Sequence, residues 1–257
     1  MQLEKVANHI KNWLIDYVKE SKLDGFVVGV SGGVDSALTA TLAASTGYKT
    51  ILLNMPIFQA DTQINRSDNQ IESLKERYSN ISSCTIDLTT LFKSAQECFP
   101  SDVQDELTMA NTRARLRMTT LYAFASSNRL LVTGTGNKIE DFGVGFYTKY
   151  GDGGVDISPI ADLLKSEVFQ LAEYLNVNKE ILTAQPTDGL WGDNRSDEDQ
   201  LGATYSELEW AMQNSHSDRS SFSLRQREVM EIYTRLNKVN QHKILPIPVC
   251  EIPEDFK

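Results

Sequence analysis

Short apolar runs alternate with segments of helical spacing along the first half of the chain. Helical spacing is found at 6–18, 34–47, 64–78 and 102–127, and the apolar runs predict strands at 26–30, 50–55, 82–86 and 130–133. Parallel neighbours need a crossover connection, so this order predicts an α/β fold: a doubly wound, mostly parallel sheet with helices on both faces. Ligands of such sheets bind at the carboxyl ends of the strands.

The second half of the chain has helical patterns but few strand signals. We predict helices at 161–175, 202–213 and 223–238, and we interpret the acidic, glycine-containing stretch Asp188–Gly202 as a mobile loop. No internal repeat or linker divides the sequence. We therefore expect one domain over residues 1–257.

The amino-acid composition limits which kinds of ligand the protein is expected to bind and in which cellular compartment it is expected to work. The net charge of −10 disfavours a broad nucleic-acid surface, which leaves small molecules as the expected ligands. The sequence has neither the ~20 consecutive apolar residues of a membrane span nor a signal peptide, so we expect a soluble, cytoplasmic protein without membrane contacts. Cys84, Cys98 and Cys250 have no metal-ligand spacing and are interpreted as ordinary thiols.

The strand at 26–30 runs directly into the sequence SGGVDS (residues 31–36), which begins the next predicted helix. A lone Ser-Gly-Gly is usually a tight turn with a serine cap. In this position, however, the loop amides and the helix N-terminus converge on one point, which favours an anion such as a phosphate. Ser31 and Ser36 add hydroxyl donors, and Asp35 is suited to the magnesium that accompanies ATP. A Walker A loop would end in Gly-Lys-Ser/Thr instead.

Four further strings contain residues suited to ligand binding. They are NTRARLRM (111–118), GTGNKIED (134–141), FYTKYGDGGVD (146–156) and the pair His242-Lys243. Taken singly, each has an ordinary explanation: solvated arginines on different faces of a helix, a Gly-x-Gly turn, a glycine-rich hairpin and surface side chains. The same holds for Lys165 and Thr187, which are surface-type residues by themselves.

Together these strings resemble the NAD synthetase family, specifically its ammonia-dependent members, over nearly the whole chain. The family belongs to the pyrophosphatase-type ATP-loop superfamily, which implies the adenine nucleotide alpha hydrolase-like fold. By this resemblance, ATP is bound by Gly29, Val30, Ser31, Gly32, Gly33, Val34, Asp35, Ser36, Thr135, Lys165 and Thr187. Deamido-NAD is bound by Arg115, Lys149, Asp156, His242 and Lys243.

The resemblance also implies a magnesium cofactor and a catalytic pair, Asp35 and Lys165. The metal is held by Asp35 and by an acidic residue that follows Thr135. Counting forward from Thr135 selects Glu140, which we take as the ligand, whereas counting backward from Lys149 selects Asp141; both remain open. Where family members often continue the His-Lys pair with arginine, this chain has isoleucine at position 244.

The reaction implied by the resemblance is ATP-dependent amidation of deamido-NAD. The nicotinic carboxylate attacks the α-phosphate of ATP, diphosphate leaves, and ammonia then displaces AMP from the NAD-adenylate. The family resemblance occupies all 257 residues, so we expect no glutaminase domain and direct use of ammonia. It also implies a homodimer, and a mobile lid at 191–199 that excludes water from the adenylate.

Two other kinds of function share the nucleotide loop. One is another ATP pyrophosphatase, either a GMP synthetase-like amidotransferase or a tRNA-modifying enzyme; the other is a non-catalytic ATP-sensing module. The string FYTKYGDGG argues against the GMP synthetase, and the acidic composition and lack of paired cysteines argue against tRNA thiolation. A sensor would need only the strand, the loop and the helix.

Overall fold

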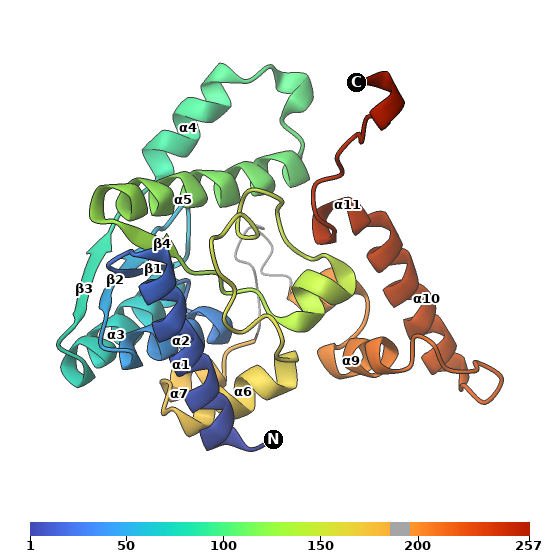
Figure 1. The fold of residues 1–257 in the computed structure, drawn as a ribbon, viewed down its shortest axis with the longest axis horizontal. Coiled ribbons are helices and arrows are strands. Elements are labelled where there is room, and N and C mark those ends of the chain that lie inside the picture. Colours follow the sequence, from blue (N-terminus) through green and yellow to red (C-terminus); the bar gives the residue numbers. More distant parts are fainter. Residues whose placement is uncertain (186–195) are drawn as a thin grey trace.

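A parallel four-stranded sheet lies toward one side of the molecule in the computed structural model, which describes residues 1–185 and 196–257 (Figure 1). The strands lie in the order β3-β2-β1-β4. Their bounds are Gly25–Gly29 for β1, Lys49–Asn54 for β2, Ile81–Thr85 for β3 and Leu130–Val132 for β4. All three neighbouring pairs are parallel. The predicted sheet is confirmed, and each predicted strand is within one residue of the observed one.

Alternating side chains of β1 pack into separate apolar cores on the two faces of the sheet. Phe26 and Val28 belong to one core, and Val27 belongs to the other. Helices α1 (Leu3–Ser21), α2 (Val34–Ser45), α3 (Asp61–Arg77) and α6 (Lys165–Tyr174) contribute to the first core. Helices α4 (Thr89–Cys98) and α5 (Glu106–Asn128) contribute to the second. The fold is therefore doubly wound, as predicted.

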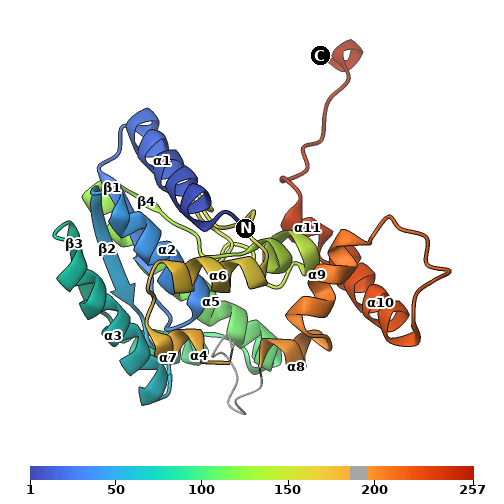
Figure 2. The same cartoon turned by 90° about the horizontal axis from the view of Figure 1, so that it is seen from below.

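A third apolar cluster lies beyond the sheet, where α9 and α10 pack against a π-helical turn, η2 (Figure 2). These elements span Tyr205–Gln213, Leu224–Val239 and Ile139–Val144, respectively. Capping boxes at Thr204 and Ser223 start the two helices. This packing fixes the position of η2 and therefore of the acidic residues in it.

Helices α4 and α8 were not predicted, and neither were the four-residue helices α7 and α11. Helix α4 is ten residues long and buries only Phe92. Helix α8 (Asp197–Leu201) lies within the stretch interpreted as a loop, and that interpretation is wrong for these residues. Ser196 caps α8 by accepting a hydrogen bond from the amide of Asp199, and the Asp199 carboxylate binds the Ser196 amide in return. Residues 186–195 lie outside the described part of the chain, so the predicted lid is described only from residue 196 onward.

The remaining helical elements are short. They are α7 (Lys179–Leu182), α11 (Gln241–Ile244) and the 3₁₀ turns η1 (Ser101–Val103) and η3 (Glu254–Phe256). Among the described helices, none combines the length and the apolar character needed to cross a membrane.

Gly25 at the start of β1 gives a test of the strand pairing. A Cβ at this position would lie 1.9 Å from the carbonyl oxygen of Lys49, and the backbone φ is +150°. We expect Gly25→Ala to lower the free energy of unfolding by roughly 2–4 kcal/mol through strain and overpacking. Denaturant unfolding followed by circular dichroism measures the change.

Gly47→Ala is the matched control, because Gly47 also has a positive φ, +80°, but no atom lies within 4 Å of its Cβ position. It should cost about 1–2 kcal/mol from backbone strain alone. Equal losses in the two variants would show that the contact with Lys49 does not matter.

Candidate active site

A cavity of about 460 Å³ lies at the carboxyl ends of β1 and β4. It is lined by the loop after β1, the segment after β4, the start of α6 and residues from α5 and η2. The predicted ATP-binding residues that line it are Gly29, Val30, Ser31, Gly32, Gly33, Val34, Asp35, Ser36, Thr135 and Lys165. Thr187 lies outside the described residues. The structure therefore brings together every described member of the predicted ATP set.

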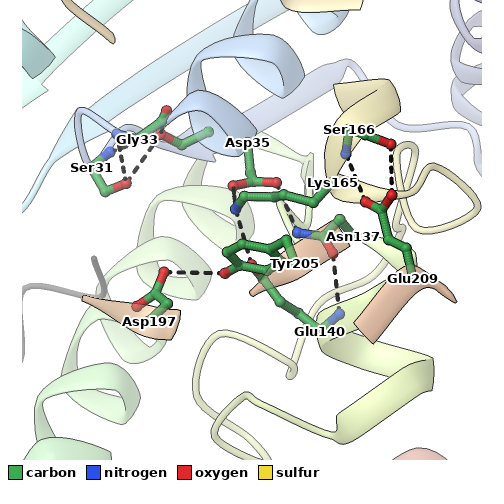
Figure 3. A network of polar contacts seen from close by, with 11 residues as sticks. Ser31, Gly33, Asp35, Asn137, Glu140, Lys165, Ser166, Asp197, Tyr205 and Glu209 are labelled. Carbon is green, nitrogen blue, oxygen red and sulfur yellow. Dashed lines mark hydrogen bonds and ion pairs between the residues drawn. The ribbon is translucent and has the colours of Figure 1, made fainter. Parts of the chain in front are cut away.

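The loop at 31–36 is held by its own hydroxyl groups (Figure 3). The Ser31 amide donates to Ser36 Oγ at 3.1 Å, and Ser36 Oγ donates to the Gly33 carbonyl at 3.0 Å. Gly32 has a φ of +80°, and a Cβ there would meet the backbone oxygen of Gln63 at 2.9 Å. Helix α2 starts without a side-chain cap, so its first amides are available to an anion in the cavity.

A buried lysine joins three distant segments beside this loop. Lys165 Nζ, at the start of α6, lies 2.6 Å from Asp35 Oδ2 in α2 and 2.9 Å from Glu140 Oε1 in η2. The lysine side chain is only 4% exposed. Asn137 completes the arrangement: its amide donates to Asp35 Oδ1 at 3.0 Å, and its oxygen accepts from the Glu140 backbone at 3.1 Å (Figure 3).

The electrostatic environment of this cluster is asymmetric. Burial opposes the charge of Lys165, but attraction by Asp35 and Glu140 raises its pKa above the ordinary value. Burial is the largest influence on Asp35 and raises its pKa. Burial also disfavours a charge on Glu140, but Lys165 and the Tyr205 hydroxyl stabilise that charge more strongly, so the pKa of Glu140 is lowered. One ammonium group thus faces two carboxylates, and the cluster carries an excess of negative charge.

Asp141, the next residue of η2, lines the same cavity. Its carboxylate is next to Gly136, where an added Cβ would be 2.1 Å from Oδ2. Burial, followed by repulsion from Glu140, Asp152 and Asp35, raises the pKa of Asp141 to about 8. Of the two candidates for the second acidic ligand, Glu140 is the one whose carboxylate shares Lys165 with Asp35.

Tyr205 is a member of the cluster that the sequence did not reveal. Its hydroxyl donates to Glu140 Oε1 at 2.5 Å and also lies 3.3 Å from Asp197 Oδ2. Its ring centroid lies 4.8 Å from Lys165 Nζ, within the range of a cation–π contact. Tyr205 follows the capping residue Thr204, but nothing local indicates that it reaches Glu140, which is 65 residues away.

Glu209 was also missed. It is buried, and its two carboxylate oxygens accept hydrogen bonds from the Ser166 amide and hydroxyl, each at 2.8 Å. These bonds satisfy one of the free amides at the start of α6 and hold the residue next to Lys165. Glu209 is therefore a positioning residue. In contrast, Asn137 stands inside the GTGNKIED string and could have been selected from the sequence.

Four of the five predicted deamido-NAD residues gather where α11 meets the loop at 145–154. Arg115 Nε donates to the Lys149 carbonyl at 3.3 Å, and Lys149 Nζ donates to the His242 carbonyl. Lys243 Nζ donates to the carbonyls of Gly145 and Tyr147, the latter at 2.8 Å. Among these four, only Lys243 lines the cavity.

Asp156 has a different position. Its carboxylate accepts hydrogen bonds from the Tyr122 hydroxyl and from the Val132 amide, both at 2.8 Å. These bonds connect the end of the glycine-rich string to α5 and β4. Asp156 does not line the cavity, so the structure does not bring it together with the ATP set.

The fold and this site define an α/β protein with a cavity at an uncapped helix N-terminus, next to a buried lysine–carboxylate cluster. A model of the NAD synthase family matches residues 6–246. The chain therefore belongs to the NAD synthase family, which makes it a ligase of NAD biosynthesis.

Relatives of known function are similar to nearly the whole chain. The NH(3)-dependent NAD(+) synthetase of Mycoplasma genitalium is 39% identical over 210 residues, covering 80% of this chain and 82% of the relative. That of Syntrophomonas wolfei subsp. wolfei is 36% identical over 264 residues and all of both chains.

Two solved structures show the same fold. The NMN synthetase of Francisella tularensis has a TM-score of 0.85 and 32% identity, with 99% of both chains covered. The NH3-dependent NAD synthetase of Campylobacter jejuni has a TM-score of 0.80 and 24% identity, with 98% of this chain and 100% of that one covered.

The hydroxyl of Tyr205 can be tested separately from its ring. We expect Tyr205→Phe to lower kcat by roughly ten- to a hundred-fold, since a hydrogen bond to a charged group contributes ~1.5–3 kcal/mol. The fold should survive, because the ring remains packed in its cluster. Steady-state kinetics and thermal unfolding measure the two quantities.

Tyr233→Phe is the matched control, since Tyr233 is a buried tyrosine of the same apolar cluster that does not line the cavity. This control should retain normal turnover. Similar kinetics in the two variants would exclude a role of the Tyr205 hydroxyl in the reaction.

Proposed function

We propose that this chain amidates deamido-NAD with ammonia, using ATP and producing NAD, AMP and diphosphate through an NAD-adenylate. The observation that carries the proposal is the meeting of the anion-binding loop with Lys165, Asp35 and Glu140 in one cavity of a NAD synthase family member. The named relatives are NH(3)-dependent NAD(+) synthetases, which supports this reaction over other ATP pyrophosphatases and over a sensor.

Adenylation is chemically necessary because a free carboxylate has no acceptable leaving group. The nicotinic carboxylate attacks the α-phosphorus, the bond to the bridging oxygen breaks, and diphosphate leaves with the electron pair. Ammonia then attacks the acyl carbon, AMP departs, and a proton is lost from the nitrogen. The amides at the start of α2 would hold the diphosphate portion, and the Lys165 ammonium would offset charge on the phosphates.

Asp35 and Glu140 would hold magnesium. Their carboxylates face the same point and carry more negative charge than Lys165 neutralises. Magnesium in such sites takes one or two carboxylates and completes its shell with phosphates and water. The ion, when bound, would neutralise charge on the transferring phosphate.

The cationic group next to α11 would bind the acceptor substrate. Arg115, Lys149 and Lys243 place three basic side chains at the loop at 145–154, and His242 contacts Lys149 through its backbone carbonyl. Such side chains suit the phosphates and the carboxylate of deamido-NAD. We assign Asp156 a supporting role for that loop, because both of its oxygens are already bonded to α5 and β4.

A second candidate reaction is amidation of nicotinic acid mononucleotide to NMN. It is favoured by the similarity, at 32% identity and 99% coverage, to the NMN synthetase of Francisella tularensis. The two acceptors share the nicotinate, the ribose and one phosphate and differ by the AMP half of the dinucleotide. The chemistry at the cavity is the same for both.

A single assay separates these functions. The protein is mixed with ATP, magnesium and ammonium and with either deamido-NAD or nicotinic acid mononucleotide, and products are measured by mass spectrometry. We expect NAD and AMP in equal amounts, with a higher kcat/KM for the dinucleotide. A preference for the mononucleotide would establish the second candidate, and no AMP with either acceptor would reject both.

The nitrogen donor is tested in the same assay. Ammonium should support the reaction and ammonia-free glutamine should not. At fixed total ammonium the rate should rise toward alkaline pH, since only unprotonated ammonia is a nucleophile. Equal rates with glutamine would contradict the proposal.

The role of Asp35 is tested by Asp35→Asn, which keeps the side-chain size but removes the charge. We expect turnover to fall roughly ten- to a hundred-fold and the magnesium requirement to rise, since a charge-assisted contact contributes ~1.5–3 kcal/mol. Asp162→Asn is the control, because Asp162 pairs with Lys138 on the surface and is 96% exposed. A wild-type magnesium titration in Asp35→Asn would remove Asp35 from the metal site.

A further inference from the structure

Four lysine and arginine side chains line the cavity within the described part of the chain, and the protein itself engages three of them. Lys165 is paired with two carboxylates, and Lys243 donates to two backbone carbonyls. The Nε of Arg117 donates to the carbonyl of Met55 at 3.0 Å. The fourth side chain is Arg66, on α3.

The guanidinium of Arg66 is not engaged in this way. Its Nε is buried and has no hydrogen-bond partner, and no acidic side chain among the described residues forms an ion pair with it. Asp68, the closest acidic residue along the sequence, instead accepts a hydrogen bond from Asn54 Nδ2 at 2.8 Å. A buried donor without an acceptor is costly, so a ligand that supplies the acceptor would be stabilised at this position.

Arg66 lies next to the anion-binding loop. A Cβ added to Gly32 of this loop would be 3.4 Å from the Cβ of Arg66 and 2.9 Å from the carbonyl oxygen of Gln63, so α3 packs directly against the loop. The Ser67 hydroxyl donates to the Val30 carbonyl at 2.7 Å in a buried hydrogen bond. This bond fixes the turn of α3 that carries Arg66 to the residue from which the loop begins.

The ligand that fits this arrangement is a chain of phosphates. The amides at the uncapped start of α2 favour an anion, and the adjacent guanidinium offers a planar fork of donors that matches two phosphate oxygens. The charge of Lys165 is shared by two carboxylates, whereas the charge of Arg66 is not shared with any described residue. A nucleobase or a ribose has no negative charge and would gain less from this group.

We propose that Arg66 binds the β- and γ-phosphates of ATP and holds the diphosphate as it leaves the α-phosphate. The proposal rests on the proposed function, because it takes ATP as the nucleotide that occupies the cavity. Arg66 contacts the part of ATP that AMP lacks, so it also contributes to the selection of the triphosphate over the monophosphate.

The variant Arg66→Gln removes the charge and the fork of donors. Isothermal titration of the full chain, with magnesium present, measures the dissociation constants of inorganic diphosphate, ATP and AMP. We expect the constants of diphosphate and ATP to rise about ten- to a hundred-fold, since a charge-assisted hydrogen bond is among the strong ones. The constant of AMP should be unchanged. Arg66→Lys keeps the charge without the fork and should give an intermediate loss.

Arg219→Gln is the matched control, because it removes the same charge from the protein. Arg219 is exposed between α9 and α10 and does not line the cavity. The control should bind all three ligands normally, and thermal unfolding of each variant should be close to that of the wild type. Equal losses in Arg219→Gln and Arg66→Gln would show an effect of net charge alone and would overturn the proposal.

The same titrations separate this proposal from the proposed function. Normal affinity of Arg66→Gln for diphosphate and ATP would overturn the role of Arg66 and leave the proposed function intact. A loss for AMP as large as that for ATP, with normal diphosphate binding, would place Arg66 at the nucleoside and would also overturn the proposal. A wild-type chain that binds neither ATP nor diphosphate would reject the proposed function, and the role of Arg66 with it.

Discussion

The active site depends on one buried ammonium group held between two carboxylates. Lys165, Asp35 and Glu140 come from α6, α2 and η2, and each element is positioned by a different part of the fold. The first apolar core holds α2 and α6 against the sheet, while the third cluster holds η2 against α9 and α10. Burying these charges costs several kcal/mol per ion, and removing one partner of a buried pair costs about 3–5 kcal/mol. Such a group persists only where the surrounding structure keeps all three charges together.

The cavity contains groups suited to anions and groups suited to cations. The uncapped amides at the start of α2 favour an anion, while Asp35, in the first turn of the same helix, shares the charge of Lys165 with Glu140. In the proposed function, a nucleotide triphosphate with a divalent cation would match both kinds of group. The pKa of the neighbouring Asp141 is raised to about 8, because burial and three nearby carboxylates disfavour one more negative charge.

The sequence predicted the parts of the structure that depend on local patterns. Four apolar runs gave the strands within one residue, and SGGVDS gave the turn between β1 and α2, where Gly32 needs its positive φ. Helix α4, which spans ten residues and buries only Phe92, was missed. Tyr205 and Glu209 were missed for another reason: their partners are 65 and 43 residues away, so their roles arise from the packing of α9 against η2 and α6. No local pattern encodes such contacts.

Asp156, the last residue of the family string, connects the loop at 145–154 to the sheet. The string FYTKYGDGGVD marks the family, yet Asp156 uses both carboxylate oxygens to join Tyr122 and the Val132 amide. This bond fixes the end of the loop at 145–154, while Lys243 fixes its beginning through the carbonyls of Gly145 and Tyr147. The loop is thus tied to the sheet at one end and to α11 at the other. A displacement of α11 would therefore move one end of this loop relative to the sheet. Because the loop forms part of the cavity wall, the shape of the cavity would change as well.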